Sequence, residues 1–424
     1  MAELYNTGFL MNQSFKLTEE LIANLRRIRD ADPDDLSNRL DLGRALLTTG
    51  RFAEAAEELQ CVFEEGRFFS FKKGFPRVRF KTLFHWRKNK HLYARAYADL
   101  AIVSMNQGNL AEAERLLTMA LKVFRLEGND AEYYRAANSL GTLYRTAGVL
   151  DAALEFHLAA KRIAEKNEKK KETAETTGNI GMVYEAGDRF DEALATHTEA
   201  LKIYETLGLV FEQACQHRQI GLCLLRAGRK NDSAKALQTA LTLFEQADDK
   251  IMQSRVLNDM ALASDGDEAL SLALEALSRA TDSGDDFETA ENALLYARLK
   301  LDRDPFDSQI ETLLLKSLDI FKKTGRQNET ANTSSTLGLL YLRRHRWDEA
   351  ESRFRDSLYL EQRLHRAFGI ASDCCNLGLI ALNKNDLQRA EEYWSKAVIL
   401  FRENGDEDHA REFERRIAGL KGRL

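Results

Sequence analysis

Residues 134–168 read YRAANSLGTLYRTAGVLDAALEFHLAAKRIAEKNE, and this stretch holds one complete copy of the unit from which the chain is built. In its first part, small or apolar residues stand at Ala137, Leu140, Gly141 and Tyr144, which is the i, i+3, i+4, i+7 spacing of an amphipathic helix. A short turn follows, and small or apolar residues then resume at helical spacing. The stretch therefore predicts two helices joined by a turn, a helical hairpin.

The hairpin pattern recurs along the chain with a nearly constant period. A small residue followed by an apolar one closes most units, and the steps in residue number between successive closing positions are 40, 40, 40, 36, 41, 40 and 40. These positions are Ala120, Ala160, Ala200, Ala240, Ala276, Ser317, Ser357 and Ala397. A fixed period of this size predicts a solenoid, which offers long binding surfaces rather than a closed catalytic pocket.

A glycine occupies one slot of the first helix in many units. Glycine inside a helix is less favourable than alanine by about 1 kcal/mol, so its recurrence needs a physical reason. The slot is filled by Gly43, Gly141, Gly181, Gly221, Gly338 and Gly378. We expect two helix backbones to approach each other closely there, with the alanines of the second helix as the matching small surfaces.

A first helix with Leu-Gly-x-x-Tyr, a polar or glycine turn and a second helix with spaced alanines resembles the tetratricopeptide repeat. The resemblance covers roughly residues 34–405 as nine units. The period is longer than the one usual in that family, and glycine often replaces the usual closing proline. Such units resemble those of kinesin light chains, Leu-Gly-Asn-repeat adaptors and bacterial peptide-sensing regulators. The resemblance implies an all-α, right-handed superhelical solenoid of about nine hairpins with terminal capping helices.

Breaks in the repeat suggest how the chain is organised. The sixth unit is shorter than the others, which we attribute to its internal turn, and the seventh lacks the Leu-Gly pair. The expected parts are a capping helix at 1–33, unit 1 at 34–66, an insertion at 67–93, units 2–5 at 94–250, degenerate units 6–7 at 251–326, units 8–9 at 327–406 and a capping helix at 407–424.

Composition favours an intracellular, soluble protein. The five cysteines are an odd number without the spacing of a disulfide framework, which favours a reducing compartment. The N-terminal region contains no apolar core of a secretion signal, and no stretch approaches the roughly 18 apolar residues of a membrane helix. We expect a cytoplasmic location.

The segment 67–90 differs from the rest of the chain in charge and in aromatic content. It contains nine Lys or Arg residues, no acidic residue, six phenylalanines and one tryptophan. The chain has a net charge of −6, so the remainder without these nine cations carries −15. The candidate basic contact residues are Lys72, Lys73, Arg77, Arg79, Lys81, Arg87 and Lys88.

Several interpretations of this segment stay open. Cations among aromatic residues can hold single-stranded nucleic acid through phosphate neutralisation and base stacking. The same mixture can lie on an anionic membrane surface or bind another protein. The segment can also be structural, an elongated hairpin with its aromatic rings packed on neighbouring helices and its charges in solvent.

Sequence motifs of catalysis are missing. The chain has no phosphate-binding loop, no dinucleotide-binding glycine pattern and no HExxH metal motif. His157 and His197 stand one period apart in equivalent slots, which favours a packing role over a ligand role. Cys215 and His217 are too close in sequence to share a helix face. We therefore expect no enzymatic activity, no cofactor, no metal site and no small-molecule substrate.

The family resemblance implies a partner-binding groove lined by the first helices. By that resemblance, its side chains are those of Arg95, Arg135, Asn138, Thr142, Arg145, Glu175, Asn179, Arg218, Gln219, Arg226, Asn332, Arg343 and Asn376. Asn offers a paired donor and acceptor to a peptide backbone, and Arg binds carboxylates in bidentate fashion. The Lys and Asn set with which some family members hold a C-terminal carboxylate is not found here.

These observations predict a non-enzymatic adaptor that binds a peptide or helical segment of another protein in its groove. One alternative is a protein associated with nucleic acid or an anionic surface through 67–90. The other is a regulatory protein that responds to a peptide.

Overall fold

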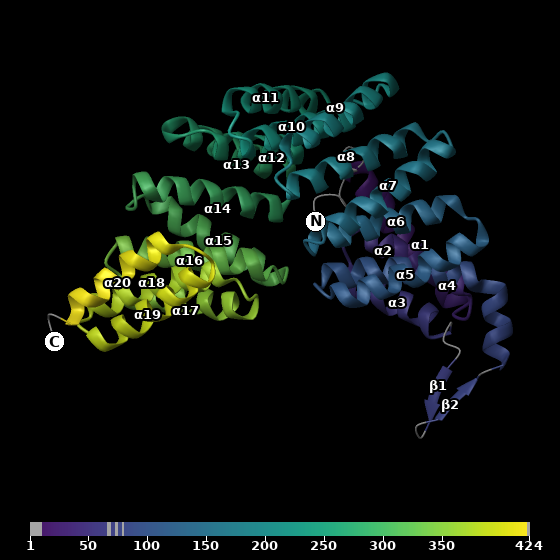
Figure 1. Ribbon diagram of the computed structural model, residues 1–424, viewed down its shortest axis with the longest axis horizontal. Coiled ribbons are helices and arrows are strands. Elements are labelled where there is room, and N and C mark those ends of the chain that lie inside the picture. The colour runs from purple at the N-terminus through teal and green to yellow at the C-terminus, as the bar shows by residue number, and fades with distance from the viewer. Residues whose placement is uncertain (1–10, 66–68, 73–74, 79, 422–424) are drawn as a thin grey trace. The chain divides into compact units, whose positions relative to one another are not determined.

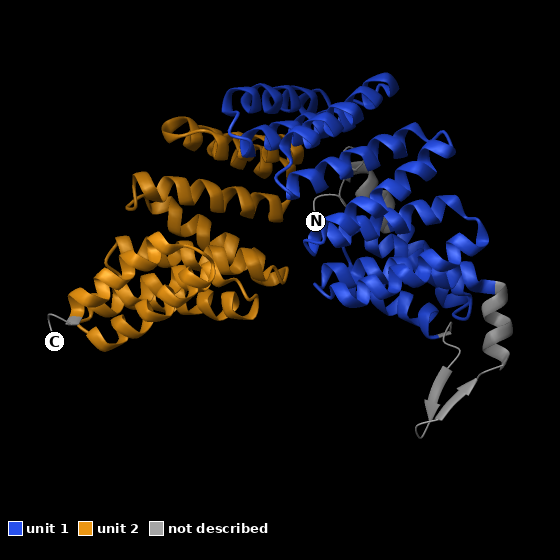
Figure 2. Ribbon diagram, viewed as in Figure 1, with its two compact units in different colours: residues 1–249 blue, residues 250–424 orange. Residues whose placement is uncertain are grey.

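The computed structural model describes residues 11–65, 69–72, 75–78 and 80–421 (Figure 1). Across these ranges the chain forms twenty helices packed as sequential hairpins, with one pair of short strands. The predicted all-α solenoid of helical hairpins is thereby confirmed. The chain divides into two compact units, residues 1–249 and 250–424, which are described separately (Figure 2).

Unit 1 consists of α1 and five helical hairpins. Its helices are α1 (Met11–Ala31), α2 (Leu36–Thr48), α3 (Phe52–Glu65), α4 (Phe80–Asn106), α5 (Leu110–Glu127), α6 (Asp130–Thr146), α7 (Leu150–Lys166), α8 (Lys170–Ala186), α9 (Phe190–Leu207), α10 (Val210–Arg226) and α11 (Lys230–Gln246). The hairpins are α2–α3, α4–α5, α6–α7, α8–α9 and α10–α11, and α1 packs on α2. The first helices α2, α4, α6 and α8 also contact one another in sequence, so they form one layer.

Unit 2 repeats this arrangement with four hairpins. Its helices are α12 (Lys250–Ala263), α13 (Gly266–Ser283), α14 (Asp286–Arg303), α15 (Ser308–Lys323), α16 (Gln327–Arg343), α17 (Trp347–Arg363), α18 (Ala367–Asn383), α19 (Leu387–Glu403) and α20 (Glu407–Lys421). The first helices α12, α14, α16 and α18 contact one another in sequence, and α20 packs on α19. The core of each unit lies between its hairpins and is lined by Leu, Ala and aromatic side chains.

At the glycine slot, the nearest atoms of the second helix belong to a side chain. A Cβ atom on Gly141 would lie 2.6 Å from the ring of His157, and one on Gly338 would lie 2.9 Å from the ring of Phe354. The same relation, always at the same separation along the chain, joins Gly43 to Leu59, Gly181 to His197, Gly221 to Leu237 and Gly378 to Trp394. The glycine therefore leaves room for a side chain of the second helix, and the backbone of that helix is also near, 3.6 Å from a Cβ atom on Gly43 and 3.3 Å from one on Gly221.

The turns between hairpins are built on a left-handed residue. Gly208 closes α9 with φ 66°, a conformation that costs a residue with a Cβ atom about 1–2 kcal/mol. The equivalent positions also have positive φ, and they are Gly128, Glu168, Asp248, Gly284, Gly325, His365 and Gly405. The turn keeps its shape even where the sequence supplies no glycine.

The shortened sixth hairpin loses most of its missing residues from a helix. Helix α12 has 14 residues, whereas the equivalent α10 has 17, and a short linker of Ser264 and Asp265 separates α12 from α13. The expectation that the turn alone absorbs the deletion is wrong, since helix α12 is about one turn shorter.

The basic aromatic insertion contains strands that an all-helical expectation does not include. β1 (Phe69–Lys72) pairs in antiparallel fashion with β2 (Phe75–Val78). Helix α4 then begins at Phe80 and continues to Asn106, with a single non-helical residue at Asn89. At Asn89 the helix is kinked, so α4 consists of two helical segments, the first of which lies within the segment 67–93.

Candidate partner-binding face

The first helices of unit 1 carry a series of charged and amide side chains that we call the first-helix face. It comprises Arg44 of α2, Arg95 and Asp99 of α4, Glu132, Arg135, Asn138, Thr142 and Arg145 of α6, Glu175, Asn179 and Glu185 of α8, and Arg218, Gln219 and Arg226 of α10. Because α2, α4, α6 and α8 lie in contact, side chains from successive hairpins meet across this layer.

The first group on this face is centred on a buried carboxylate. Glu132 accepts from Arg95 Nη2 at 2.8 Å and from Arg135 Nη1 at 3.2 Å, both on its Oε1 atom. Arg44 lies 3.9 Å from the other oxygen of Glu132 and donates from Nε to Asp99 at 2.7 Å. Burial opposes the charge of Arg44, but the carboxylates of Asp99 and Glu132 outweigh it and raise the pKa of its guanidinium.

The second group is an amide network between α6 and α8. Asn138 Oδ1 accepts from Asn179 Nδ2 at 3.0 Å and from His157 Nδ1 at 2.7 Å, and Asn138 Nδ2 donates to Glu175 at 3.4 Å. His157 is fully buried, and burial together with the nearby Arg145 lowers its pKa to about 4. The neutral ring therefore donates its Nδ1 proton to Asn138, which fixes the amide in place.

The third group lies between α8 and α10. Arg226 pairs with Asp188 at 3.0 Å and lies 3.9 Å from Glu185. Glu185 accepts from Nε2 of the buried His197 at 3.1 Å, and the other ring nitrogen of His197 contacts Gln216 Oε1 at 3.0 Å. Both repeated histidines thus pack against the glycine slot and also form hydrogen bonds with polar groups of the face.

The predicted groove residues are accordingly placed in three ways. The structure brings Arg95 and Arg135 together, and it does the same for Asn138, Glu175 and Asn179. Thr142, Arg145, Arg218 and Gln219 are half-buried on α6 and α10. In unit 2, Asn332 accepts from Arg366 at 3.1 Å, Arg343 pairs with Asp302 at 2.8 Å, and Asn376 donates to the carbonyl of Ser372 at 3.1 Å.

Four residues of this face were not predicted. They are the acidic residues Asp99, Glu132 and Glu185 and the basic residue Arg44. Each of the acids is largely buried and pairs with a more exposed arginine. A signal for one of them exists in the sequence, because Glu132 and Arg135 stand at the i, i+3 spacing of one helix face. The other pairs join different hairpins, and local spacing carries no information about them.

The candidate basic contact segment falls mostly outside the described part of the chain. Lys73 and Arg79 lie outside the described residues. For Lys72, Arg77, Lys81, Arg87 and Lys88 only the backbone is described, as parts of β1, β2 and α4. At the end of the segment, Lys90 pairs with Glu127 of α5 at 3.3 Å.

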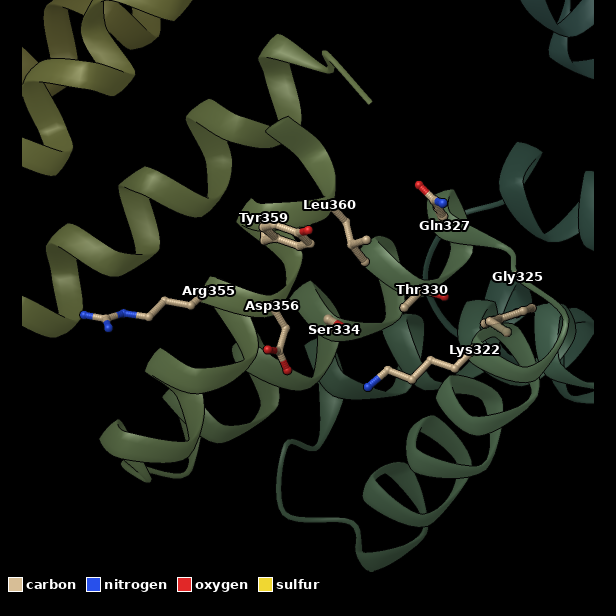
Figure 3. Close-up of a pocket in the computed structure, with 10 residues that line it drawn as sticks. Lys322, Gly325, Gln327, Thr330, Ser334, Arg355, Asp356, Tyr359 and Leu360 are labelled. Carbon is tan, nitrogen blue, oxygen red and sulfur yellow. The ribbon is translucent and has the colours of Figure 1, made fainter. Parts of the chain in front are cut away.

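Unit 2 contains a cleft of about 460 Å³ between α15, α16 and α17 (Figure 3). Phe321, Thr330, Ser334, Tyr359 and Leu360 are among its lining residues. In Figure 3 the side chain of Lys322 extends towards the middle of the cleft, whereas that of Arg355 extends away from it. Ser334 is fully buried, and its hydroxyl has no hydrogen-bond partner in the described structure.

Two kinds of feature are missing from the described part of the chain. Among the residues that the structure describes, no three or more His, Cys, Asp and Glu side chains are grouped so that they could hold a metal ion. Within those same ranges, no helix has both the length and the apolar character needed to span a membrane.

Models of the tetratricopeptide repeat match the sequence at residues 22–60, 94–125 and 132–206. A signal transduction ATPase with a tetratricopeptide repeat sensor from Pyrococcus horikoshii has a similar structure, with TM-score 0.55, 12% identity, and coverage of 96% of this chain and 67% of that one. Aspartyl phosphate phosphatase F from Bacillus subtilis has TM-score 0.52 and 13% identity, with coverage of 85% of this chain and 93% of that one. The quorum sensor NprR from B. thuringiensis has TM-score 0.52 and 13% identity, with coverage of 87% of this chain and 99% of that one. At such identities the likeness concerns the fold. No curated protein matches the sequence.

Proposed function

The chain is a tetratricopeptide repeat protein, and from this premise we propose that it binds a segment of another protein on the first-helix face of unit 1. The binding is non-catalytic, and the bound segment is a peptide or a helix that places a few anchor side chains on the face. The protein then acts as an adaptor.

The observation that carries this proposal is the fixed placement of polar groups along contacting first helices. Asn138 is held by Asn179 and His157, and Arg95 and Arg135 are held by Glu132. Groups that are already ordered lose little conformational entropy when a partner binds, so this face is preorganised for recognition.

Two features of the exposed groups match the needs of a peptide. Arg135 and Glu175 stand in equivalent slots of neighbouring hairpins, and both are exposed. They offer one cationic and one anionic contact to side chains, while the second amide N–H of Asn138 can donate to a peptide carbonyl. Beneath the face, the glycine-and-histidine packing joins each of these first helices to the second helix of its own hairpin.

The experiment uses the full chain with a photo-crosslinking amino acid at position 135, at position 175 or, as a control, at position 115. Arg115 is exposed on the second helix α5 and pairs with Glu112 at the i, i+3 spacing, as Arg135 pairs with Glu132. We expect the same partner segment to be crosslinked from positions 135 and 175 and not from 115. Mass spectrometry identifies the segment, which is then synthesised.

The synthetic segment provides the quantitative test. Combining Arg135→Glu with Glu175→Lys should weaken its binding by about tenfold or more, because reversed charges oppose the same contacts, while Arg115→Glu leaves binding unchanged. Binding that survives this double substitution, and is lost when 67–90 is replaced by a Gly/Ser linker or after nuclease treatment, contradicts the proposal.

A further inference from the structure

Three guanidinium groups from three different helices converge on one carboxylate of unit 1. Arg44 comes from α2, Arg95 from α4 and Arg135 from α6, and all three lie within 3.9 Å of an oxygen of Glu132. Arg95 and Arg135 share the single oxygen Oε1. Such a meeting of like charges requires the hairpins to be packed in register, since no two of the three arginines belong to the same hairpin.

The carboxylates lie deeper than the arginines that they hold. The side chain of Glu132 is 5% exposed and that of Asp99 is 10% exposed. The side chains of Arg44, Arg95 and Arg135 are 30%, 35% and 64% exposed. The negative groups therefore form the floor of the cluster, and the positive groups form its solvent-facing surface.

The two buried carboxylates accept from only some of the N–H groups of the three arginines. Each guanidinium has five N–H groups in a rigid fork, so three of them offer far more donors than Glu132 and Asp99 occupy. In the cluster, three cations lie over two buried carboxylates. Asp41, exposed on α2, is the further acidic group that acts on Arg44.

We propose that Arg44, Arg95 and Arg135 form a site for an oxyanion, a carboxylate or a phosphate group carried by the partner segment. The inference rests on the proposed function, because it names the chemistry that the first-helix face selects. Glu132 and Asp99 act as positioning residues, since they hold three mutually repelling cations close together. Arg135, the most exposed, makes the first contact with the anion, and Arg95 completes a bidentate arrangement.

The test measures anion binding to the full chain without any partner. The probe is radiolabelled inorganic phosphate, followed by equilibrium dialysis at constant ionic strength, with glutarate as competing dicarboxylate. We expect saturable binding at one site per chain. Arg135→Gln should weaken it by about fivefold or more, since charge-assisted contacts to an oxyanion are lost.

Arg115→Gln is the matched control, because Arg115 also pairs with a glutamate at the i, i+3 spacing but lies on α5 outside the cluster. Competition by glutarate assigns the site to oxyanions in general, whereas binding of phosphate alone assigns it to phosphorylated side chains. Absence of saturable binding, or equal effects of Arg135→Gln and Arg115→Gln, overturns the inference. Circular dichroism confirms that both variants are folded.

Failure here is distinguishable from failure of the proposed function. If crosslinking at position 175 identifies a partner segment while phosphate and glutarate do not bind, the face binds proteins by other chemistry and the oxyanion site is wrong. If the anions bind and no segment is crosslinked from 135 or 175, the oxyanion site stands and the peptide-binding function is wrong.

Discussion

Gly141 of α6 lies directly against the ring of His157 in α7, the second helix of the same hairpin: a Cβ atom on Gly141 would be 2.6 Å from both Cδ2 and Nε2 of the ring. The ring is fully buried, and its Nδ1 proton is bound to Asn138. Since the ring is fully buried and its Nδ1 is bonded to Asn138, moving it away from an added methyl group would disturb the packed core.

Substituting Gly141 by alanine should therefore destabilise unit 1 by about 1–3 kcal/mol, the cost of overpacking a filled core. Urea unfolding followed by circular dichroism measures it. In the double variant Gly141→Ala with His157→Ala, the methyl group enters the space that the ring has left, so the loss should be smaller than the sum of the two single losses. Strictly additive losses would show that the two residues do not compete for the same space.

A second prediction concerns the turns between hairpins. An added Cβ atom meets nothing within 4 Å at Gly208 or at Gly419, but Gly208 has φ 66° whereas Gly419 lies within helix α20. Gly208→Ala should lower stability by about 1–2 kcal/mol through backbone strain alone. Gly419→Ala should raise stability by up to about 1 kcal/mol through helix propensity. Thermal unfolding of both variants is the measurement, and changes of the same sign would contradict this explanation.

A third prediction follows from a buried carboxyl group in unit 2. Asp373 of α18 is 1% exposed, accepts from the Ser335 hydroxyl at 3.1 Å, and has no partner for its Oδ2 atom in the described structure. Burial raises its pKa to about 7; the hydroxyls of Ser335 and Ser357 and the charge of Arg366 work against this rise, while the nearby Glu361 adds to it.

Because the pKa of Asp373 is higher in the folded than in the unfolded chain, its ionisation disfavours folding. The stability of unit 2 should be complete below the ordinary pKa of 3.8 and should fall as pH rises to about 7. The loss corresponds to at most about 4 kcal/mol. Asp373→Asn should match the wild type near pH 4 and exceed it in stability at pH 8, as measured by urea unfolding at several pH values. A constant difference in stability at all pH values contradicts the prediction.

The cleft of unit 2 supports a fourth prediction. The hydroxyl of Ser334 is buried without a partner in the described structure, whereas the neighbouring Ser335 donates to Asp373. Removing an unsatisfied buried hydroxyl relieves a desolvation cost, so Ser334→Ala should be neutral or stabilising by up to about 1 kcal/mol. Ser335→Ala should destabilise by about 1–3 kcal/mol, because it leaves a buried carboxylate oxygen unpaired. Thermal unfolding compares the two, and a larger loss for Ser334→Ala would indicate that its hydroxyl has a bound partner.

The fold was predictable from the sequence because the repeat is local. The spacing of Ala137, Leu140, Gly141 and Tyr144 defines one helix. The same hairpin pattern recurs along the chain, with a nearly constant period from the second hairpin onward. The side chain that packs against each glycine was not predictable. The residues concerned differ in type and share only their separation from the glycine along the sequence; they include Leu59, His157, Phe354 and Trp394. Because the second-helix position opposite the glycine holds residues of different types, no single residue type marks it in the sequence.

The site was predictable only in part. Arg95 and Arg135 were predicted as groove residues because the family resemblance assigns their equivalent slots to the groove. Asp99 and Glu132 were missed, because carboxylates on a helix are usually solvated and nothing in the sequence indicates that these two are buried. Their burial depends on contacts between α2, α4 and α6, which arise only when three hairpins are assembled. The strands of the insertion were missed because each has only four residues, the shortest length at which alternation of apolar and polar residues indicates a strand.

The constant separation between each glycine and its large neighbour also bears on how such a chain changes in length. Both members always belong to one hairpin, and hairpins are joined at a left-handed turn residue such as Gly208 or Gly128. A duplication or deletion of one whole hairpin that starts and ends at these turns keeps every glycine with its own partner, so the descendant chain inherits intact packing. Arginines that meet across hairpins have no such protection, and gene rearrangements of this kind therefore alter the charged groups of the first-helix face before they alter how the chain folds.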